Sequence, residues 1–165
     1  MSANTDLKRR LELLEDECRR LKDIEAIKSL KARYWYCVDN KLWDEVAECF
    51  AEESDLFGLS LTQKKSIAKF YKRVVEPYFT VTVHQGHNPE IELVSDTEAK
   101  GRWQLDQFGI EKGSKQGVRI GITYQDRYVK EGNAWKIKSI RTTYIYREVV
   151  KIEEFAEGMP RGILK

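Results

Sequence analysis

A chain of 165 residues has the length of a single domain and can bury a hydrophobic core without disulfides. Apolar residues make up 41% of the sequence and charged residues 34%, with a net charge of +2, as in soluble globular proteins. Such a balance provides no general electrostatic attraction for nucleic acid or for a membrane surface. We therefore expect neither as a partner.

The cysteines and the N-terminal residues indicate a cytoplasmic protein. Cys18, Cys37 and Cys49 form no C-x-x-C pair, and their odd number argues against a disulfide framework or a zinc cluster. Residues 1–23 are charged throughout and lack the apolar region of a signal peptide. No stretch approaches the roughly eighteen apolar residues of a membrane span.

The first predicted helix begins with a repeating apolar pattern. Leu7, Leu11, Leu14, Cys18 and Leu21 are spaced alternately by four and three residues, which is a heptad seam. The seam lasts only two heptads, so two interpretations stay open. It is either the inner face of a helix packed on its own domain or a helical contact between subunits. Helical spacing continues to about residue 38.

The remaining elements follow in a simple order. A second helix is expected over residues 42–50, a short strand over 55–60, and a third helix from Ser60 or Thr62 until Pro77 stops it. Alternating patterns then predict strands over 79–87, 99–108, 118–129 and 135–147, with residues 91–94 either a bent continuation of the first of these or a new strand. In the last strand the apolar face switches between Ile137 and Ile140, which indicates a β-bulge.

Helices followed by strands are typical of the α+β class. The sheet is expected to be mostly antiparallel and strongly curved, and to leave a cavity between itself and the helices. We divide the chain into an N-terminal amphipathic extension over 1–20, a domain over 21–148 and a C-terminal tail over 149–165.

The two histidines of the chain, His84 and His87, lie in the segment VHQGHNPEI. His84 ends a β-branched run, so we expect its ring near the core, and histidine suits a general base at neutral pH. A hydrogen-bonded structural role is the alternative. His87, beside Gly86 and Asn88, has the surroundings of a bulge or loop residue. H-x-x-H is also half of a metal site, but no third ligand is evident, and we expect no metal.

Two further candidates lie at the end of the first long helix. Tyr34 continues the apolar face of that helix, so its ring should point inward, as a core tyrosine or a site residue. Asp39 falls at the helix C-terminus, where a carboxylate opposes the helix dipole. It is either a turn residue or a residue kept there for chemistry.

The strand GRWQLDQF supplies Trp103, Asp106 and Gln107. In a regular strand Asp106 and Gln107 point to opposite faces. Trp103 shares the parity of Gln107 and should face inward because it is large and apolar. Parity therefore favours Gln107 as the pocket residue, unless a bulge intervenes.

Four segments resemble the SnoaL-like family, a branch of the nuclear-transport-factor-like α+β cone superfamily. They are DIEAIKSLKARYWYCVDNKLWDEVAECF, VHQGHNPEIEL, TEAKGRW and YQDRYVKEGNAWKIKSIRTTYIY, within residues 20–147. Among members, the bile-acid 7α-dehydratases are most similar, and scytalone dehydratase and lindane dehydrochlorinase are more distant. The resemblance implies a cone-shaped barrel of curved sheet packed on about three N-terminal helices.

The resemblance also implies roles for individual residues. Tyr34 and Asp39 match a catalytic tyrosine and aspartate five residues apart, and His84 matches a catalytic histidine. A second aspartate of the family falls at Gln107, with Asp106 one position away, which is a departure. The set expected to contact substrate comprises His87, Trp103, Asp106, Gln107, Tyr124 and Tyr144.

We therefore expect a lyase that dehydrates a small apolar substrate bearing a carbonyl group, steroid-like or polyketide-like. His84 would be the base, Asp39 would orient it, and Tyr34 would donate a hydrogen bond. No organic cofactor is expected, because the chain has neither a P-loop nor a G-x-G-x-x-G motif. The alternatives are an isomerase or cyclase with the same pocket, and a non-catalytic domain that binds a hydrophobic ligand or serves assembly. Homo-oligomers, dimers or trimers, are expected by the resemblance.

Overall fold

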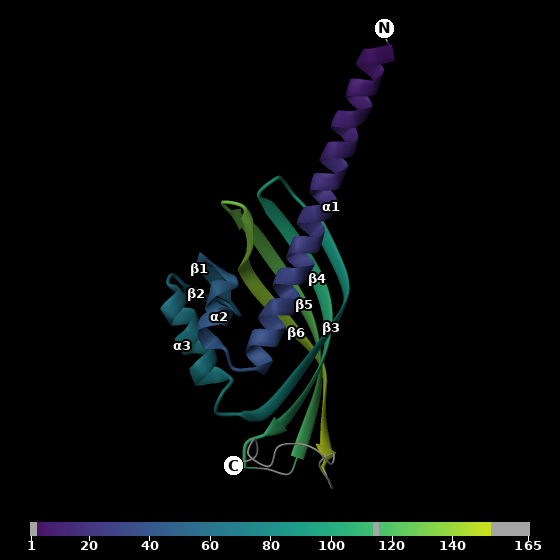
Figure 1. Cartoon of the computed structure of the whole chain (residues 1–165). Coiled ribbons are helices and arrows are strands. Elements are labelled where there is room, and N and C mark those ends of the chain that lie inside the picture. The colour runs from purple at the N-terminus through teal and green to yellow at the C-terminus, as the bar shows by residue number, and fades with distance from the viewer. Residues whose placement is uncertain (1–2, 114–115, 153–165) are drawn as a thin grey trace.

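The computed structural model describes residues 3–113 and 116–152. Helix α1 (Ala3–Asp39) is followed by α2 (Trp43–Glu48), strands β1 (Phe50–Leu56) and β2 (Leu59–Leu61), and helix α3 (Lys64–Val74). Four long strands complete the described chain, namely β3 (Phe79–Leu93), β4 (Glu98–Glu111), β5 (Gln116–Glu131) and β6 (Ala134–Lys151). The expected α+β class with helices preceding most of the sheet is confirmed (Figure 1).

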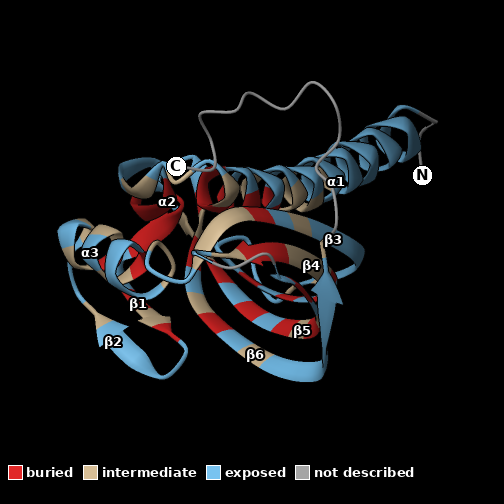
Figure 2. Cartoon of the chain, turned by 90° about the horizontal axis from the view of Figure 1, so that it is seen from below, coloured by how far each residue is buried: buried red, intermediate tan, exposed pale blue. Residues whose placement is uncertain are grey.

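The six described strands form one sheet in the order β2-β1-β6-β5-β4-β3. All neighbours are antiparallel except β1 and β6, which run parallel. The sheet is strongly curved and has two edges, so it is not closed into a complete barrel (Figure 2). Helix α1 runs along the inner side of this curve, while α2 and α3 lie beside it near β1 (Figures 1 and 2).

Two features of the strands differ from the expected pattern or refine it. The expected strand over 55–60 is wrong in extent, because two strands, β1 and β2, meet at a turn with positive φ at Phe57 and Gly58. The adjacent acids Glu52 and Glu53 obscure the alternation in β1. The bulge expected in β6 is confirmed: Lys138 lies unpaired between Ile137, opposite Tyr128, and Ser139, opposite Arg127.

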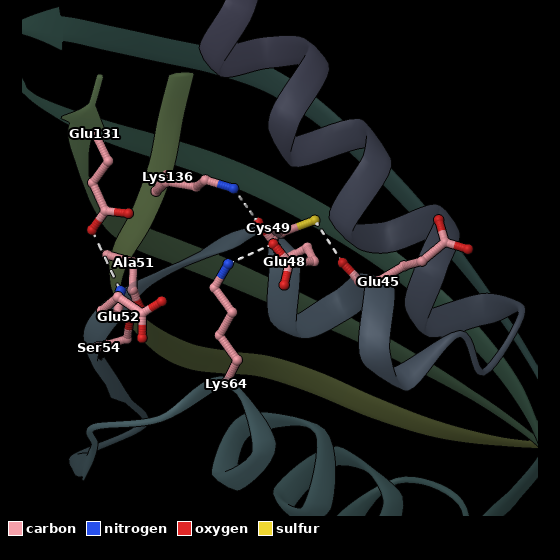
Figure 3. Close-up of polar contacts among 9 residues, drawn as sticks. All are labelled: Glu45, Glu48, Cys49, Ala51, Glu52, Ser54, Lys64, Glu131 and Lys136. Atoms are coloured by element: carbon pink, nitrogen blue, oxygen red, sulfur yellow. Dashed lines mark hydrogen bonds and ion pairs between the residues drawn. The ribbon is translucent and has the colours of Figure 1, made fainter. Parts of the chain in front are cut away.

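Polar contacts join α2, β1 and α3 to the end of the sheet (Figure 3). The Glu48 carboxylate accepts from Lys64 Nζ of α3 at 2.5 Å, and the Glu48 carbonyl accepts from Lys136 Nζ of β6 at 2.5 Å. The Ser54 hydroxyl donates to the Ala51 carbonyl at 2.8 Å. The two contacts of Glu48 thus join α3, α2 and β6, whereas the contact of Ser54 lies within β1.

The core lies between α1, α2, α3 and the concave face of the sheet, where the buried residues gather (Figure 2). On α1, only the second half contributes, through residues such as Ile27, Tyr34, Trp35 and Val38. The first half projects beyond the sheet (Figure 1). The interpretation that its leucine seam packs on its own domain is therefore wrong, since the seam leucines are 56–64% exposed.

Two expectations concern the ends of the chain and its hydropathy. The tail expected over 149–165 falls largely outside the described residues, and residues 149–151 continue β6. Among the described helices, none combines the length and hydropathy needed to span a bilayer.

Candidate active site

His84 and Asp39 form a close pair between β3 and the end of α1. His84 Nδ1 lies 2.5 Å from Asp39 Oδ1, and the backbone N–H of His84 donates to Asp39 Oδ2 at 2.9 Å. One carboxylate thus holds both the strand and the ring. The His84 side chain is 8% exposed and that of Asp39 20%. In the tautomer that carries its proton on Nδ1, the ring donates to the carboxylate and Nε2 is left as an acceptor.

The helix end is built to hold Asp39 in place. The Asn40 side-chain amide donates to the Tyr36 carbonyl at 2.8 Å, which satisfies a C-terminal carbonyl of α1. Lys41 then adopts the left-handed conformation, with φ of 58°, and its ammonium donates to the Thr80 carbonyl of β3 at 2.9 Å. The turn therefore fastens the end of α1 to the strand that carries His84.

A cavity of about 370 Å³ lies beside this pair. Trp35 and Trp103 form its apolar wall, with their rings edge to face and their centroids 5.4 Å apart. Gly86 makes this arrangement possible, because a Cβ at that position would lie 1.9 Å from the Trp35 ring. The lining residues are Lys28, Ala32, Trp35, Tyr36, Asp39, His84, Gln85, Gly86 and Trp103.

Sequence reasoning missed Lys28, Ala32 and Tyr36 as neighbours of Asp39. They precede it by eleven, seven and three residues, which places all four on one stripe of a helix. Counting back from Asp39 at helical spacing would have found them. Tyr34 precedes Asp39 by five residues, which corresponds to roughly 140° around the helix.

Tyr34 accordingly lies on the inner side of α1 and does not line the 370 Å³ cavity. Its hydroxyl shares a hydrogen bond of 2.9 Å with the Tyr71 hydroxyl of α3. Burial raises the pKa of both phenols well above the usual value, so both are neutral and either hydroxyl can be the donor of the shared bond. The pair is a polar element in an otherwise aromatic interior.

The register of β3 and β4 separates Gln107 from Asp106. Gln107 lies directly opposite His84, so the two side chains share a face of the sheet. Asp106 points the other way and forms an ion pair with Arg119, which lowers the pKa of the carboxyl below its usual value. Tyr146 also donates to Asp106, at 3.3 Å.

The other residues expected to contact substrate lie apart from the cavity. His87 is exposed and immediately precedes the bulge in which Asn88 and Pro89 oppose Trp103 alone. Tyr124 is buried in the core with its ring 6.0 Å from that of Trp35. Tyr144 is 68% exposed on β6.

A second polar centre lies on the inner side of α1. Lys31 Nζ is 2.7 Å from Asp126 Oδ2 of β5, and both side chains are fully buried. Burial lowers the pKa of Lys31 and raises that of Asp126, while their mutual attraction opposes both shifts. The ammonium also lies 4.1 Å from the centre of the Tyr124 ring. No sequence motif indicated this pair, because an isolated lysine on an apolar helix face has no spacing signature.

Several buried polar atoms, on α1, β3 and β5, have no hydrogen-bond partner within the described chain. They are Trp35 Nε1, Thr82 Oγ1 and Asp126 Oδ1. Thr82 lies two residues before His84 on β3, so both side chains lie on the same face of the strand. Unpaired buried donors and acceptors are costly unless water or a ligand contacts them.

A larger hollow has a volume of about 820 Å³ and is lined mainly by charged side chains. Along the strands these residues alternate with residues of the core. Ion pairs such as Arg141–Asp55 and Arg102–Glu90 occupy it. It contains none of the residues expected at the site, so the smaller cavity beside His84 is the better candidate. Within residues 3–113 and 116–152, no group of three or more histidine, cysteine or acidic side chains is placed to hold a metal ion.

The helices, the open curved sheet and the acid–base pair at a cavity define an α+β protein of the cone-like type with a candidate active site. Residues 19–141 match the family model described as a SnoaL-like domain, and the chain belongs to this family. The further likeness to the bile-acid 7α-dehydratases stays a prediction.

Solved structures of the same fold include two dehydrochlorinases and one dehydratase. Hexachlorocyclohexane dehydrochlorinase LinA type 2 matches with a TM-score of 0.78 and 20% identity, over 87% of this chain and 99% of that one. LinA type 3 from Novosphingobium barchaimii matches with a TM-score of 0.75 and 20% identity, over 85% and 98%. A proposed scytalone dehydratase from Novosphingobium aromaticivorans gives 0.73 and 21%, over 86% and 99%. At these identities the likeness establishes the fold.

Proposed function

We propose that the protein is a cofactor-independent lyase that dehydrates a small, largely apolar substrate bearing a carbonyl group. The observation that carries the proposal is the His84–Asp39 pair, with Nδ1 of the ring held by a carboxylate, beside a cavity walled by two tryptophans. A positioned base of this kind accelerates proton transfer by roughly 10²–10⁴-fold. The names of the structural neighbours, two dehydrochlorinases and a dehydratase, fit elimination chemistry.

In the proposed reaction, His84 Nε2 takes the proton from the carbon next to the carbonyl. The electron pair of that C–H bond forms the new C=C bond, and the hydroxyl on the neighbouring carbon departs. The departing oxygen takes this proton from the His84 imidazolium and leaves as water, which returns His84 to its neutral form. Asp39 holds the imidazole in the reactive tautomer and stabilises its charged form.

Tyr34 is proposed to donate a hydrogen bond to the carbonyl or to the departing hydroxyl. Its neutral phenol and the unpaired Thr82 hydroxyl, two residues from His84, support a polar binding surface on the inner side of α1. This role requires the substrate to extend past Trp35 to reach that side. A hydrogen bond of this type supplies a few kcal/mol of transition-state stabilisation.

Gln107 gives the proposed site an amide where the family resemblance places a carboxylate. Its position opposite His84 supports a contact with substrate, because the Gln107 side chain shares the face of the sheet that carries His84 and does not lie on the outer face. An amide both donates and accepts hydrogen bonds but does not take up a proton. We therefore propose a single acid–base residue, His84, for both halves of the reaction.

The test is a pair of histidine variants assayed on hydroxy-ketones and steroid-like enones. His84→Gln keeps a hydrogen-bonding side chain but should abolish turnover, while the Kd of a bound substrate changes by less than about tenfold. His87→Gln is the matched control and should keep most activity. Binding without turnover in the wild-type protein would support a ligand-binding domain, and a dead His87→Gln variant would contradict the assignment.

A pair of tyrosine variants tests the hydrogen-bond donor in the same assay. Tyr34→Phe is expected to lower kcat by at least about tenfold, whereas Tyr36→Phe should have a smaller effect. The opposite result would assign the donor to Tyr36, which lines the cavity. It would leave the His84 assignment intact.

A further inference from the structure

The projecting half of α1 carries an apolar face that its own domain does not cover. Leu7, Leu11, Leu14 and Leu21 are 64%, 56%, 58% and 57% exposed, and Cys18 completes the stripe. In heptad notation Leu11 and Cys18 occupy a positions and the other three occupy d positions. The helix is anchored by its packed second half, so the projecting turns do not need to nucleate alone.

The charges beside this seam lack partners within the described chain. Arg10 and Glu17 occupy g positions, and Glu15 and Lys22 occupy e positions. None of these four forms an ion pair with another described residue. By contrast, Lys8 pairs with Glu12 and Arg19 with Asp16 within the helix.

We propose that two copies of this chain associate through residues 7–22 of α1 as a short parallel coiled coil. In a parallel pair, a g residue faces the e residue five positions further along the other helix. Arg10 would then face Glu15 of the second copy, and Glu17 would face Lys22. Both pairs are attractive, and each occurs twice by symmetry. This complementarity identifies a second copy as the occupant of the seam.

The parallel arrangement also fits the apolar residues best. It stacks each of the five seam residues on its equivalent in the second copy. In an antiparallel pair, the register that keeps opposite charges together would place Leu21 of one helix opposite Asn4 of the other, so an apolar residue would face a polar one. The seam ends where the helix joins its own domain, since Asp23 accepts from Lys130 and Trp135 and Glu25 takes the next a position.

Cys18 reports on this contact in the full-length protein. It is the exposed cysteine among the three, while Cys37 and Cys49 are buried. In the parallel pair the two Cys18 side chains adjoin across the seam, so mild oxidation should yield a covalent dimer. Cys18→Ser should yield none.

Leucine variants separate the seam from the rest of the helix surface. Leu14→Asp should slow formation of the covalent dimer at least tenfold and lower the solution mass at a given concentration. Leu13→Asp is the matched control, because Leu13 is similarly exposed, at 62%, but lies outside the seam. Equal cross-linking rates for the two variants would overturn the proposal. The two variants are compared by the rate of Cys18–Cys18 cross-linking, which reports on the seam itself. Association of the protein through another face therefore does not mask the result.

Charge variants test the orientation of the two helices. Glu17→Lys should weaken association, because it places a positive charge against Lys22 of the second copy. Adding Lys22→Glu should restore association. Restoration instead by Arg10→Glu in the Glu17→Lys background, with no Cys18 cross-link, would overturn the parallel arrangement.

Discussion

Asp39 binds two groups of one residue, the ring and the backbone N–H of His84. A carboxylate at a helix C-terminus opposes the helix dipole, which costs a few tenths of a kcal/mol or more. The two hydrogen bonds to His84 account for its presence there. Both carboxylate oxygens of Asp39 are therefore engaged with His84. The side-chain amide of an asparagine has only one accepting oxygen and could not replace both.

Asp39→Asn should therefore impair turnover far more than stability. An asparagine whose carbonyl accepts the backbone N–H presents its amide N–H to Nδ1, which places the ring proton on Nε2. A base that already carries the proton is inactive, so kcat should fall by about a hundredfold or more. Thermal unfolding should shift by only a few degrees. Full turnover combined with a large loss of melting temperature would support a turn role instead.

The positions of some single site residues were predicted from the sequence, and those of others were not. The β-branched run placed the His84 ring near the core and parity placed Gln107 on the face of Trp103, because composition and strand alternation are local properties. Lys31 and Asp126 were not predicted, because their pairing joins residues far apart in the sequence. Tyr36, which lines the cavity and is 62% exposed, was overlooked because it lies outside the apolar pattern of the helix.

The ion pair Lys31–Asp126 connects two elements, α1 and β5, inside the core. A buried pair contributes little net stability against apolar residues of similar size, but removal of one partner leaves an uncompensated charge. The Asp126 carboxylate would retain its hydrogen bond from Tyr128, at 2.8 Å, and lose its only described counter-charge.

Lys31→Met should lower the free energy of unfolding by about 3–5 kcal/mol, measured by urea denaturation. The double variant Lys31→Met with Asp126→Leu should recover most of that loss. Lys130→Met, which removes a partly exposed pair with Asp23, is the matched control and should cost about 1 kcal/mol or less. Equal losses for the two single variants would show that burial of the Lys31 pair is irrelevant.

Elements with a strong periodic pattern were predicted, and short ones with a mixed pattern were not. The long strands and the β6 bulge follow from alternation and its interruption. The extent of β1 and its parallel pairing with β6 were missed, because the pairing depends on where the α2 and α3 layer places that segment. The leucine seam was visible in the sequence, but its exposure depends on how far the sheet reaches along α1.

For the whole molecule, acid should weaken the fold through carboxylates paired on the sheet. Hydrogen bonds from Arg141 lower the pKa of Asp55, and those from Arg119 lower the pKa of Asp106. A lowered pKa means that the unfolded chain takes up the proton first as the pH falls. The stability from these pairs is therefore fully present above the unfolded-state pKa of about 4 and is lost below it.

Urea unfolding at pH 3, 4, 5 and 6 measures this contribution. The free energy of unfolding should fall between pH 5 and pH 3, and Asp55→Asn should make that fall shallower. Asp96→Asn, in the turn between β3 and β4, is the control with no ion pair among the described residues. An identical pH dependence for the Asp55→Asn variant and the wild type would contradict the argument.

The central claim is that Asp39 holds the His84 ring so that Nε2 is free to act as a base. Long-range ¹H–¹⁵N correlation spectra of the full-length protein, recorded where the imidazoles are neutral, distinguish the two tautomers directly. The chain has only two histidines, and His87→Gln assigns the signals. We expect His84 as the Nδ1–H tautomer in the wild type and as the Nε2–H tautomer in Asp39→Asn. An Nε2–H ring in the wild type, or a tautomer unchanged in Asp39→Asn, would contradict the claim.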